Sequence, residues 1–180
     1  MNEAYENEKP WEPLEQMLEA ESPSGLKEYF DQLSSGEIAR SISRLSAEDQ
    51  HRLFQLLSPE NAADLAEMLP VAQMTEVIQE LPPETAADIL EEMSSNDRAD
   101  LLGLLEEDGA EAIFEHMEPE AASDARQLAR YPADVAGGLM LTEYLVYPQT
   151  ASVGDVVDDF QRNAEAYSDY DVQYTYVVTP

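Results

Sequence analysis

Apolar and polar positions along the middle of the chain follow a period of 12 residues, and each period opens on leucine or methionine. These opening residues are Leu33, Leu45, Leu57, Leu69, Leu81, Met93, Leu105 and Met117. A fixed internal period is typical of repeat architectures, in which every unit forms the same structural element. Further apolar residues recur inside each unit at three- and four-residue spacing, as Ala62, Leu65 and Ala66 do after Leu57. This spacing places them on one face of a helix.

The polar positions of each unit predict where its helix begins. Four units carry serine, a good N-cap, directly after the opening residue: Ser34, Ser46, Ser58 and Ser94. Three units carry proline at the next position, where the first turn of a helix tolerates the missing N–H: Pro59, Pro83 and Pro119. Because short helices are not stable alone, the units must stack around a shared core. The predicted fold is mainly α, a superhelix of single-helix units followed by a truncated α/β segment.

The segments in front of the array are less regular. Residues 1–12 are polar and predict disorder, whereas residues 13–20 predict a short helix. Ser22 to Gly25 reads as a break, because serine, proline and glycine favour turns. A helix over residues 26–33 is then expected to lead into the array, which runs to about Ala129.

The pattern changes after the array. Pro132 is expected to end the last helix, and Gly137 and its neighbour Gly138 to form a hinge. Beyond them, residues 144–147 predict a strand, residues 152–160 a helix and residues 172–178 a second strand. About 40 residues are too few to build a core of their own. The expectation is therefore a fragment of a longer protein that ends inside a second domain.

Charge narrows the choice of partners. The net charge is −30 and lysine occurs only twice. Nucleic acids are excluded because binding them requires lysine and arginine to neutralise phosphates, and anionic membrane surfaces are disfavoured for the same reason. Cations or a basic protein surface are the natural partners. A general adaptation to salt is the competing explanation, because charge also keeps proteins soluble.

The residues that usually carry chemistry are sparse. Cysteine is absent, which excludes disulfides and thiolate metal sites, and the histidines His51 and His116 lie in separate repeats. A zinc site is therefore not expected, nor is a phosphate-binding glycine loop. The acidic N-terminus does not resemble a secretory signal, and no apolar run approaches the roughly 20 residues of a membrane span. These observations predict a soluble protein that is not an enzyme.

Carboxylates at the eighth position of the units are the best candidates for function. They are Asp64, Glu76, Asp88, Asp100 and Asp124. In a two-layer stack, alternate helices share a row, so Asp64 and Asp88 are expected on one row and the other three on the opposite row. An ordinary solvated face is one interpretation of this pattern. The other is a ladder of like charges that a hard divalent cation such as Mg²⁺, Ca²⁺ or Mn²⁺ would relieve.

Two motifs resemble those of the MgtE family of magnesium transporters and channels. The first is the repeated [LM]-[SP]-P-E-x-A-A-D pattern, which is similar to the cytosolic N-terminal domain of that family. The second is the run A-R-Y-P-A-D-V-A-G-G-L-M-L-T-E-Y at residues 129–144, which resembles the junction that follows this domain. Residues 172–178 are similar to a strand early in the first CBS domain. The resemblance covers roughly residues 26–180.

The resemblance implies a domain order: a tail with a short helix at 1–25, the superhelix at 26–131, a linker at 132–142 and a partial CBS domain at 143–180. It implies a homodimeric protein of the inner or plasma membrane, whose acidic cytoplasmic domains dock through several regulatory Mg²⁺ ions. Its partners would be Mg²⁺ and the remaining CBS and transmembrane domains of the same protein. High Mg²⁺ would hold the assembly compact, with transport shut off, and low Mg²⁺ would release it.

The residues that would hold Mg²⁺ are Asp64, Asp88, Asn96, Asp97 and Asp100. Asp64 and Asp100 match acidic positions of the family's repeats. Asn96 stands where the family's acidic run begins with aspartate, so it offers only a neutral oxygen ligand. The alternative function is an acidic helical-repeat adaptor that binds a basic protein.

Overall fold

The structure is a computed structural model that describes residues 11–131, 135–142, 144–164, 167 and 174–179. It is mainly α, as the period predicts. The superhelix consists of α1 (Trp11–Glu19), α2 (Pro23–Phe30), α3 (Ser35–Ile42), α4 (Ala47–Leu56), α5 (Pro59–Glu67), α6 (Val71–Glu80), α7 (Pro83–Glu92), α8 (Ser95–Leu104), α9 (Glu107–Phe114) and α10 (Pro119–Leu128). Within the described chain, no helix has the length and apolarity to cross a bilayer.

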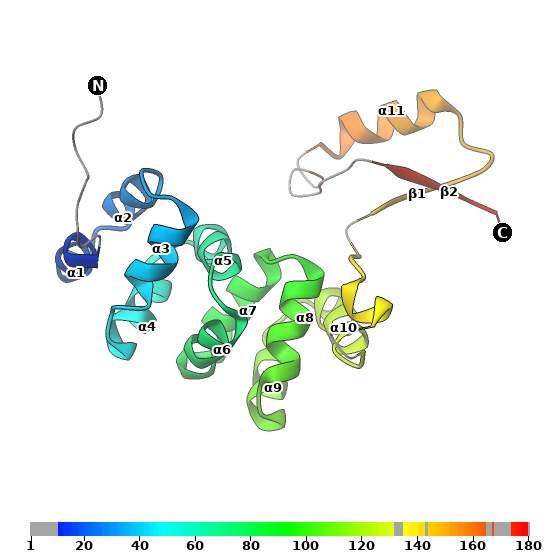
Figure 1. The fold of residues 1–180 in the computed structure, drawn as a ribbon. Helices are drawn as coiled ribbons and strands as arrows, with labels where there is room; N and C mark the ends of the chain where they lie inside the picture. The colour runs from blue at the N-terminus through cyan, green and yellow to red at the C-terminus, as the bar shows by residue number, and fades with distance from the viewer. Residues whose placement is uncertain (1–10, 132–134, 143, 165–166, 168–173, 180) are drawn as a thin grey trace, which may run out of the picture.

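The helices alternate between two rows. Helix α4 packs on α6, α6 on α8 and α8 on α10, while α5 packs on α7 and α7 on α9. Each helix therefore lies beside the one two units away, and the array winds as a two-layered superhelix (Figure 1). This is the arrangement that the alternating-row argument requires.

Local sequence signals set the helix starts. The side chain of Ser46 accepts a 3.1 Å hydrogen bond from the N–H of Asp49 at the start of α4, and Ser58 caps α5 in the same way. Pro59, Pro83 and Pro119 are the first residues of α5, α7 and α10. The N-cap and proline predictions are thus confirmed at these helices.

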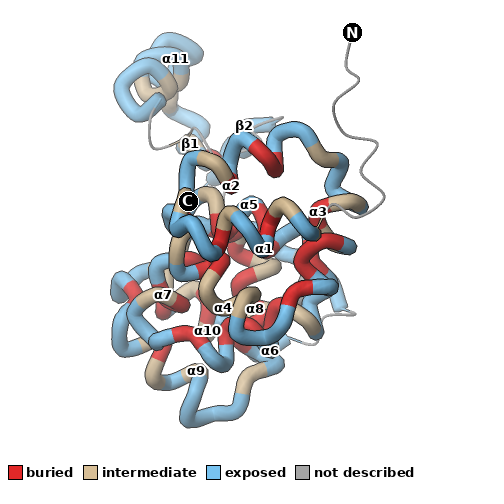
Figure 2. The backbone as a smooth tube through the Cα atoms, turned by 90° about the vertical axis from the view of Figure 1, so that its left-hand side faces the viewer, coloured by how far each residue is buried: buried red, intermediate tan, exposed pale blue. Residues whose placement is uncertain are grey.

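The recurring apolar residues form one continuous core between the rows, seen as the buried interior of the array in Figure 2. Ala62 and Ala86 are 0% exposed, which shows how closely neighbouring helices approach. Six of the eight opening residues are buried: Leu45, Leu57, Leu69, Leu81, Met93 and Met117. Leu33 and Leu105 are partly buried against the same core.

The N-terminal boundaries differ from expectation. Helix α1 already begins at Trp11, so the end of the predicted tail is helical, and residues 1–10 lie outside the described part. The predicted break from Ser22 to Gly25 is mostly helix, because α2 begins at Pro23. Ser22 caps it by accepting a hydrogen bond from the N–H of Gly25. Serine and proline here signal a helix start and not a break.

After α10 comes a short 3-10 helix, η1 (Ala136–Leu139), and then a β-α-β unit of β1 (Leu145–Pro148), α11 (Val153–Arg162) and β2 (Thr175–Val178). Strands β1 and β2 are parallel, with Leu145 opposite Thr175. The β-α-β prediction is confirmed, although residues 172 and 173 of its second strand lie outside the described part.

Glycine at position 137 permits a close approach of the chain and does not form the expected hinge with unusual backbone angles. Gly137 lies inside η1, and no described glycine has a positive φ. A Cβ at Gly137 would lie 2.5 Å from Cδ1 of Tyr131, so glycine is needed here for a close approach.

Candidate functional site

The eighth-position carboxylates lie on the two rows as the alternation requires. Asp64 on α5, Glu76 on α6 and Asp88 on α7 are exposed, whereas Asp100 on α8 and Asp124 on α10 are half-buried. Two arginine ion pairs in the described part of the chain involve other carboxylates. Arg52 pairs with Glu21 at 3.0 Å and Arg126 pairs with Glu111 at 2.7 Å.

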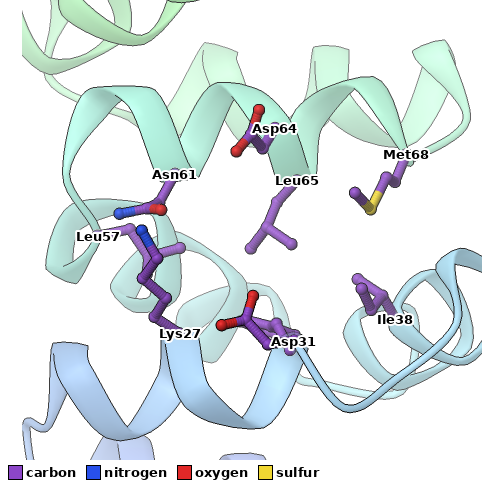
Figure 3. A pocket seen from close by; sticks show the side chains of 9 residues that line it. Lys27, Asp31, Ile38, Leu57, Asn61, Asp64, Leu65 and Met68 are labelled. Carbon is purple, nitrogen blue, oxygen red and sulfur yellow. The ribbon is translucent and has the colours of Figure 1, made fainter.

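Asp64 lines a hollow of about 90 Å³ between α2, α3 and α5, called here the α5 hollow. Asp64 lies on the α5 side and Asp31 on the α2 side, with Leu65 between them (Figure 3). The other residues that line the α5 hollow are Lys27, Phe30, Ile38, Leu57, Asn61 and Met68. The Lys27 ammonium places a positive charge in the same hollow. It opposes the attraction of Asp64 for a second cation, because like charges repel.

Two other candidate acids, Asp97 and Asp100, lie on α8. Asp97 and Asp100 line a hollow of about 80 Å³, called here the α8 hollow, and Glu67 from the end of α5 joins them. The remaining lining residues are apolar: Ala66, Leu69, Val71, Met74, Met93 and Leu101. The three carboxylates therefore line one hollow with an apolar floor, and no lysine or arginine is among the residues that line it. The α8 hollow is therefore the stronger candidate of the two for a cation site.

Hydrogen bonds hold Asp97 and Glu67 at the start of α8. Oδ2 of Asp97 accepts from the hydroxyl of Ser94 at 2.9 Å, and Oδ1 accepts from the amide of Asn96 at 3.3 Å. Oε1 of Glu67 accepts from the backbone N–H of Ser94 at 3.0 Å. A carboxylate has about four lone-pair sites, so each group keeps capacity for a metal ion or its water shell.

The donor chemistry fits Mg²⁺, which prefers carboxylate oxygens and retains several waters. The ligand count is low, however. The described residues contain no group of three or more His, Cys, Asp or Glu side chains placed to hold a metal ion together. An ion at Asp97 or Asp100 would take its remaining ligands from water or from a second surface. Asp88 lines neither hollow, and Asn96 directs its amide nitrogen toward Asp97.

Sequence reasoning missed three residues of this region. Glu67 belongs to a different repeat, so the 12-residue period gives no reason to place it beside Asp97. Ser95 and Arg98 of α8 are only 1% and 6% exposed. Arg98 stands at the sixth position of its unit, which is alanine at Ala62 and elsewhere. That departure from the repeat pattern is the signal that could have found it.

Comparisons with known proteins agree on the family. The family described as "MgtE intracellular N domain" matches residues 33–134. The chain is similar to a structure described as the soluble part of a magnesium transporter, with 24% identity and a TM-score of 0.75 over 96% of this chain and 67% of that one. At this identity the likeness shows the fold alone.

The chain is also similar to the cytosolic domain of the Mg²⁺ channel MgtE solved in complex with ATP. That comparison has 28% identity and a TM-score of 0.75, and it covers 93% of this chain and 68% of that one. A comparison with curated proteins found no match. Because the family match spans more than half of its residues, the chain belongs to the MgtE intracellular N domain family.

Proposed function

We propose that this chain is the Mg²⁺-sensing regulatory region of a magnesium transporter or channel, on the cytoplasmic face of the membrane. In this proposal it gates transport when its acidic surfaces dock through divalent cations. Family membership supports the proposal, as does the similarity to a structure described as the cytosolic domain of a Mg²⁺ channel.

The observation that carries the proposal is the α8 hollow. Glu67, Asp97 and Asp100 line it with no basic residue, yet the described residues do not complete a metal site. A surface that attracts a divalent ion but offers too few ligands is suited to share the ion with another surface. The proposed ligands are Asp97 and Asp100, and Asp64 belongs to a second contact weakened by Lys27. Asp88 and Asn96 have peripheral roles.

The same geometry provides a switch. Without a counter-cation, two acidic surfaces repel each other and the undocked state is favoured. An ion that binds only the docked state stabilises it by RT ln(1 + [Mg²⁺]/Kd), so the population follows the Mg²⁺ concentration. The ion supplies charge neutralisation and shared coordination, and the chain supplies the placement of the carboxylates.

The proposed division of the chain follows from this mechanism. Residues 26–131 form the sensing superhelix together with α1 and the start of α2, which fall in the expected tail at 1–25. Residues 132–142 are the linker, and residues 143–180 are part of a CBS domain. In that last unit, α11 has no buried residue and Val153 and Val177 are exposed, which suits a unit completed by further chain. The partners are the remaining CBS and transmembrane domains, in a homodimer.

The test is a Mg²⁺ titration of the full-length transporter, with KCl added to hold ionic strength constant. Docking is followed by protease resistance of residues 130–144. Mg²⁺ should protect this segment where K⁺ does not, because screening depends only on ionic strength. The double variant Asp97→Asn/Asp100→Asn should raise the Mg²⁺ midpoint about tenfold or more, since one lost charged ligand costs about 1.4 kcal/mol or more.

Asp124→Asn is the matched control, because Asp124 is an eighth-position acid on the same row outside both hollows. It should shift the midpoint less than twofold. Equal protection by Mg²⁺ and K⁺ would contradict the sensor and leave the acidic adaptor as the better explanation.

A further inference from the structure

The linker that leaves the superhelix is fastened to it at two points. The backbone N–H of Thr142 donates a 2.9 Å hydrogen bond to Oγ of Ser95, the first residue of α8. Gly137 lies so close to the ring of Tyr131, just after α10, that a Cβ would meet it at 2.5 Å. Helix η1 also contacts α8. The described linker residues therefore contact the superhelix at Gly137 and Thr142, while Val135, Met140 and Leu141 are exposed.

The contact at Ser95 is a buried one. Ser95 is 1% exposed, and a buried hydroxyl requires hydrogen-bond partners, so its geometry is well defined. Ser35 holds the same position in the first repeat, at the start of α3, and is exposed. Burial of this position is thus a property of α8 and its linker, not of the repeat.

Helix α8 presents the linker contact and the acids on different sides. Ser95 and Arg98 are three residues apart and share one face, and both are buried. Asp97 lies two residues after Ser95, and Asp100 lies two residues after Arg98. Two residues correspond to a rotation of about 200° around the helix axis, so each acid points away from the buried face. One helix therefore holds the linker on one side and lines the α8 hollow with carboxylates on the other.

We propose that Ser95 and Gly137 clamp the linker on α8 and thereby set the Mg²⁺ concentration at which the acidic surfaces dock. This inference rests on the proposed function. Ser95 is a positioning residue: it touches no ion, and it fixes where the β-α-β unit begins relative to Asp97 and Asp100. A fixed starting point reduces the freedom that docking would otherwise have to remove.

The size of the effect follows from linker length. With Thr142 held, only residues 143 and 144 separate it from Leu145 at the start of β1. Without the clamp, 13 residues of chain, 132–144, separate Tyr131 from Leu145. The effective concentration of tethered surfaces falls roughly as the −3/2 power of linker length, so it drops on the order of tenfold. Docking then needs more Mg²⁺, by about three- to tenfold, depending on how many ions bind together.

Two variants test the clamp independently. Ser95→Ala removes the hydrogen-bond acceptor, and Gly137→Ala pushes the linker away from Tyr131. Amide exchange at Thr142, measured in the 180-residue chain, should accelerate in Ser95→Ala. The Mg²⁺ midpoint of docking in the full-length protein should rise about threefold in each variant, the lower end of that range, because the other contact remains. Ser35→Ala, the same change at the equivalent exposed position, should alter neither quantity.

The thermal midpoint of the superhelix should not change in Ser95→Ala, which separates positioning from loss of fold. Unchanged exchange at Thr142 would overturn the inference, and so would faster exchange with an unshifted Mg²⁺ midpoint. Failure of the proposed function appears elsewhere, as a wild-type protein that responds equally to Mg²⁺ and K⁺. That result would also overturn the proposal that the clamp sets the Mg²⁺ concentration of docking.

Discussion

Oε1 of Glu67 accepts a 3.0 Å hydrogen bond from the backbone N–H of Ser94, 27 residues further along the chain. Glu91 and the N–H of Glu118 repeat this bond with the same spacing. Each bond joins the end of a helix in one row to the start of a helix in the other, from α5 to α8 and from α7 to α10. The N–H groups at the start of a helix have no acceptor within the helix. The glutamate supplies an acceptor for one of these groups at the start of α8 and of α10.

The equivalent bond is impossible at two other places. There the donor position is occupied by Pro70 and Pro82, which have no N–H. These prolines begin α6 and α7 without a capping side chain. Of these four places, the cross-row bond forms at the two that have both an N–H to satisfy and a glutamate to accept from it.

Glu67→Ala should lower the free energy of unfolding by about 1 kcal/mol, the usual contribution of a hydrogen bond at a helix N-terminus. Glu67→Gln keeps an acceptor oxygen and should lose less than half of that. Urea unfolding followed by circular dichroism measures the difference. Glu92→Ala, an exposed glutamate at the end of α7, is the control and should change stability by less than 0.5 kcal/mol, an approximate limit for surface substitutions.

Ala86→Leu should destabilise the superhelix by about 1–3 kcal/mol, because an added side chain in a closely packed core forces its neighbours apart. Ala86 is 0% exposed on α7, which packs against both α5 and α9. Ala72→Leu on the exposed side of α6 is the control, with the same small loss of helix propensity and no clash. Equal thermal midpoints for the two variants would mean that the rows separate easily.

The helices could be predicted because their signals are local. Apolar spacing, serine caps and first-turn prolines all lie within one 12-residue unit, and the alternation of rows follows from stacking such units. The α8 hollow could not be predicted in this way. Its Glu67 comes from α5 and its Asp97 from α8, and only packing between rows brings them together. The role of Gly137 was also hidden, because it depends on the ring of Tyr131 and not on the backbone angles of glycine.

The β-α-β unit should lose stability at both ends of the pH range. The hydroxyls of Tyr147 and Tyr167 donate to Oδ2 of Asp159 at 2.8 and 3.0 Å and hold the pKa of Asp159 below its ordinary value. Burial raises the pKa of Tyr147 to about 12, and its hydrogen bond to Asp159 adds to the shift. The bond from Tyr147 joins β1 to α11.

The signs follow from which form the folded state prefers. A lowered pKa means that Asp159 stabilises the unit above the unfolded value, about 3.9, and that this stability is lost as the pH falls through the folded value. A raised pKa means that Tyr147 contributes below about pH 10 and loses its contribution as the pH rises through about 12. Amide exchange across α11 should therefore accelerate in both directions.

Asp159→Asn should move the ionisation of Tyr147 from about 12 toward the ordinary tyrosine value, as followed by ultraviolet absorbance. The same variant should make exchange in α11 less sensitive to acid. Asp158→Asn removes a neighbouring exposed carboxylate and is the matched control. If both variants shift Tyr147 equally, the cause is general charge and not the hydrogen bond.

Salt should stabilise the superhelix. Residues 53–97 contain aspartate and glutamate throughout but no lysine or arginine, so their mutual repulsion is unrelieved within the segment. Raising KCl from 0.01 to 1 M shortens the Debye length from about 30 to about 3 Å and screens that repulsion. The thermal midpoint should rise by about 5 °C or more, equivalent to about 1 kcal/mol for a domain of this size.

The same salt weakens exposed ion pairs such as Arg52 with Glu21, but such pairs contribute little. A midpoint that falls with KCl would show that ion pairs outweigh repulsion. In that case, residues 53–97 would not be the surface where binding of a divalent cation relieves the most repulsion.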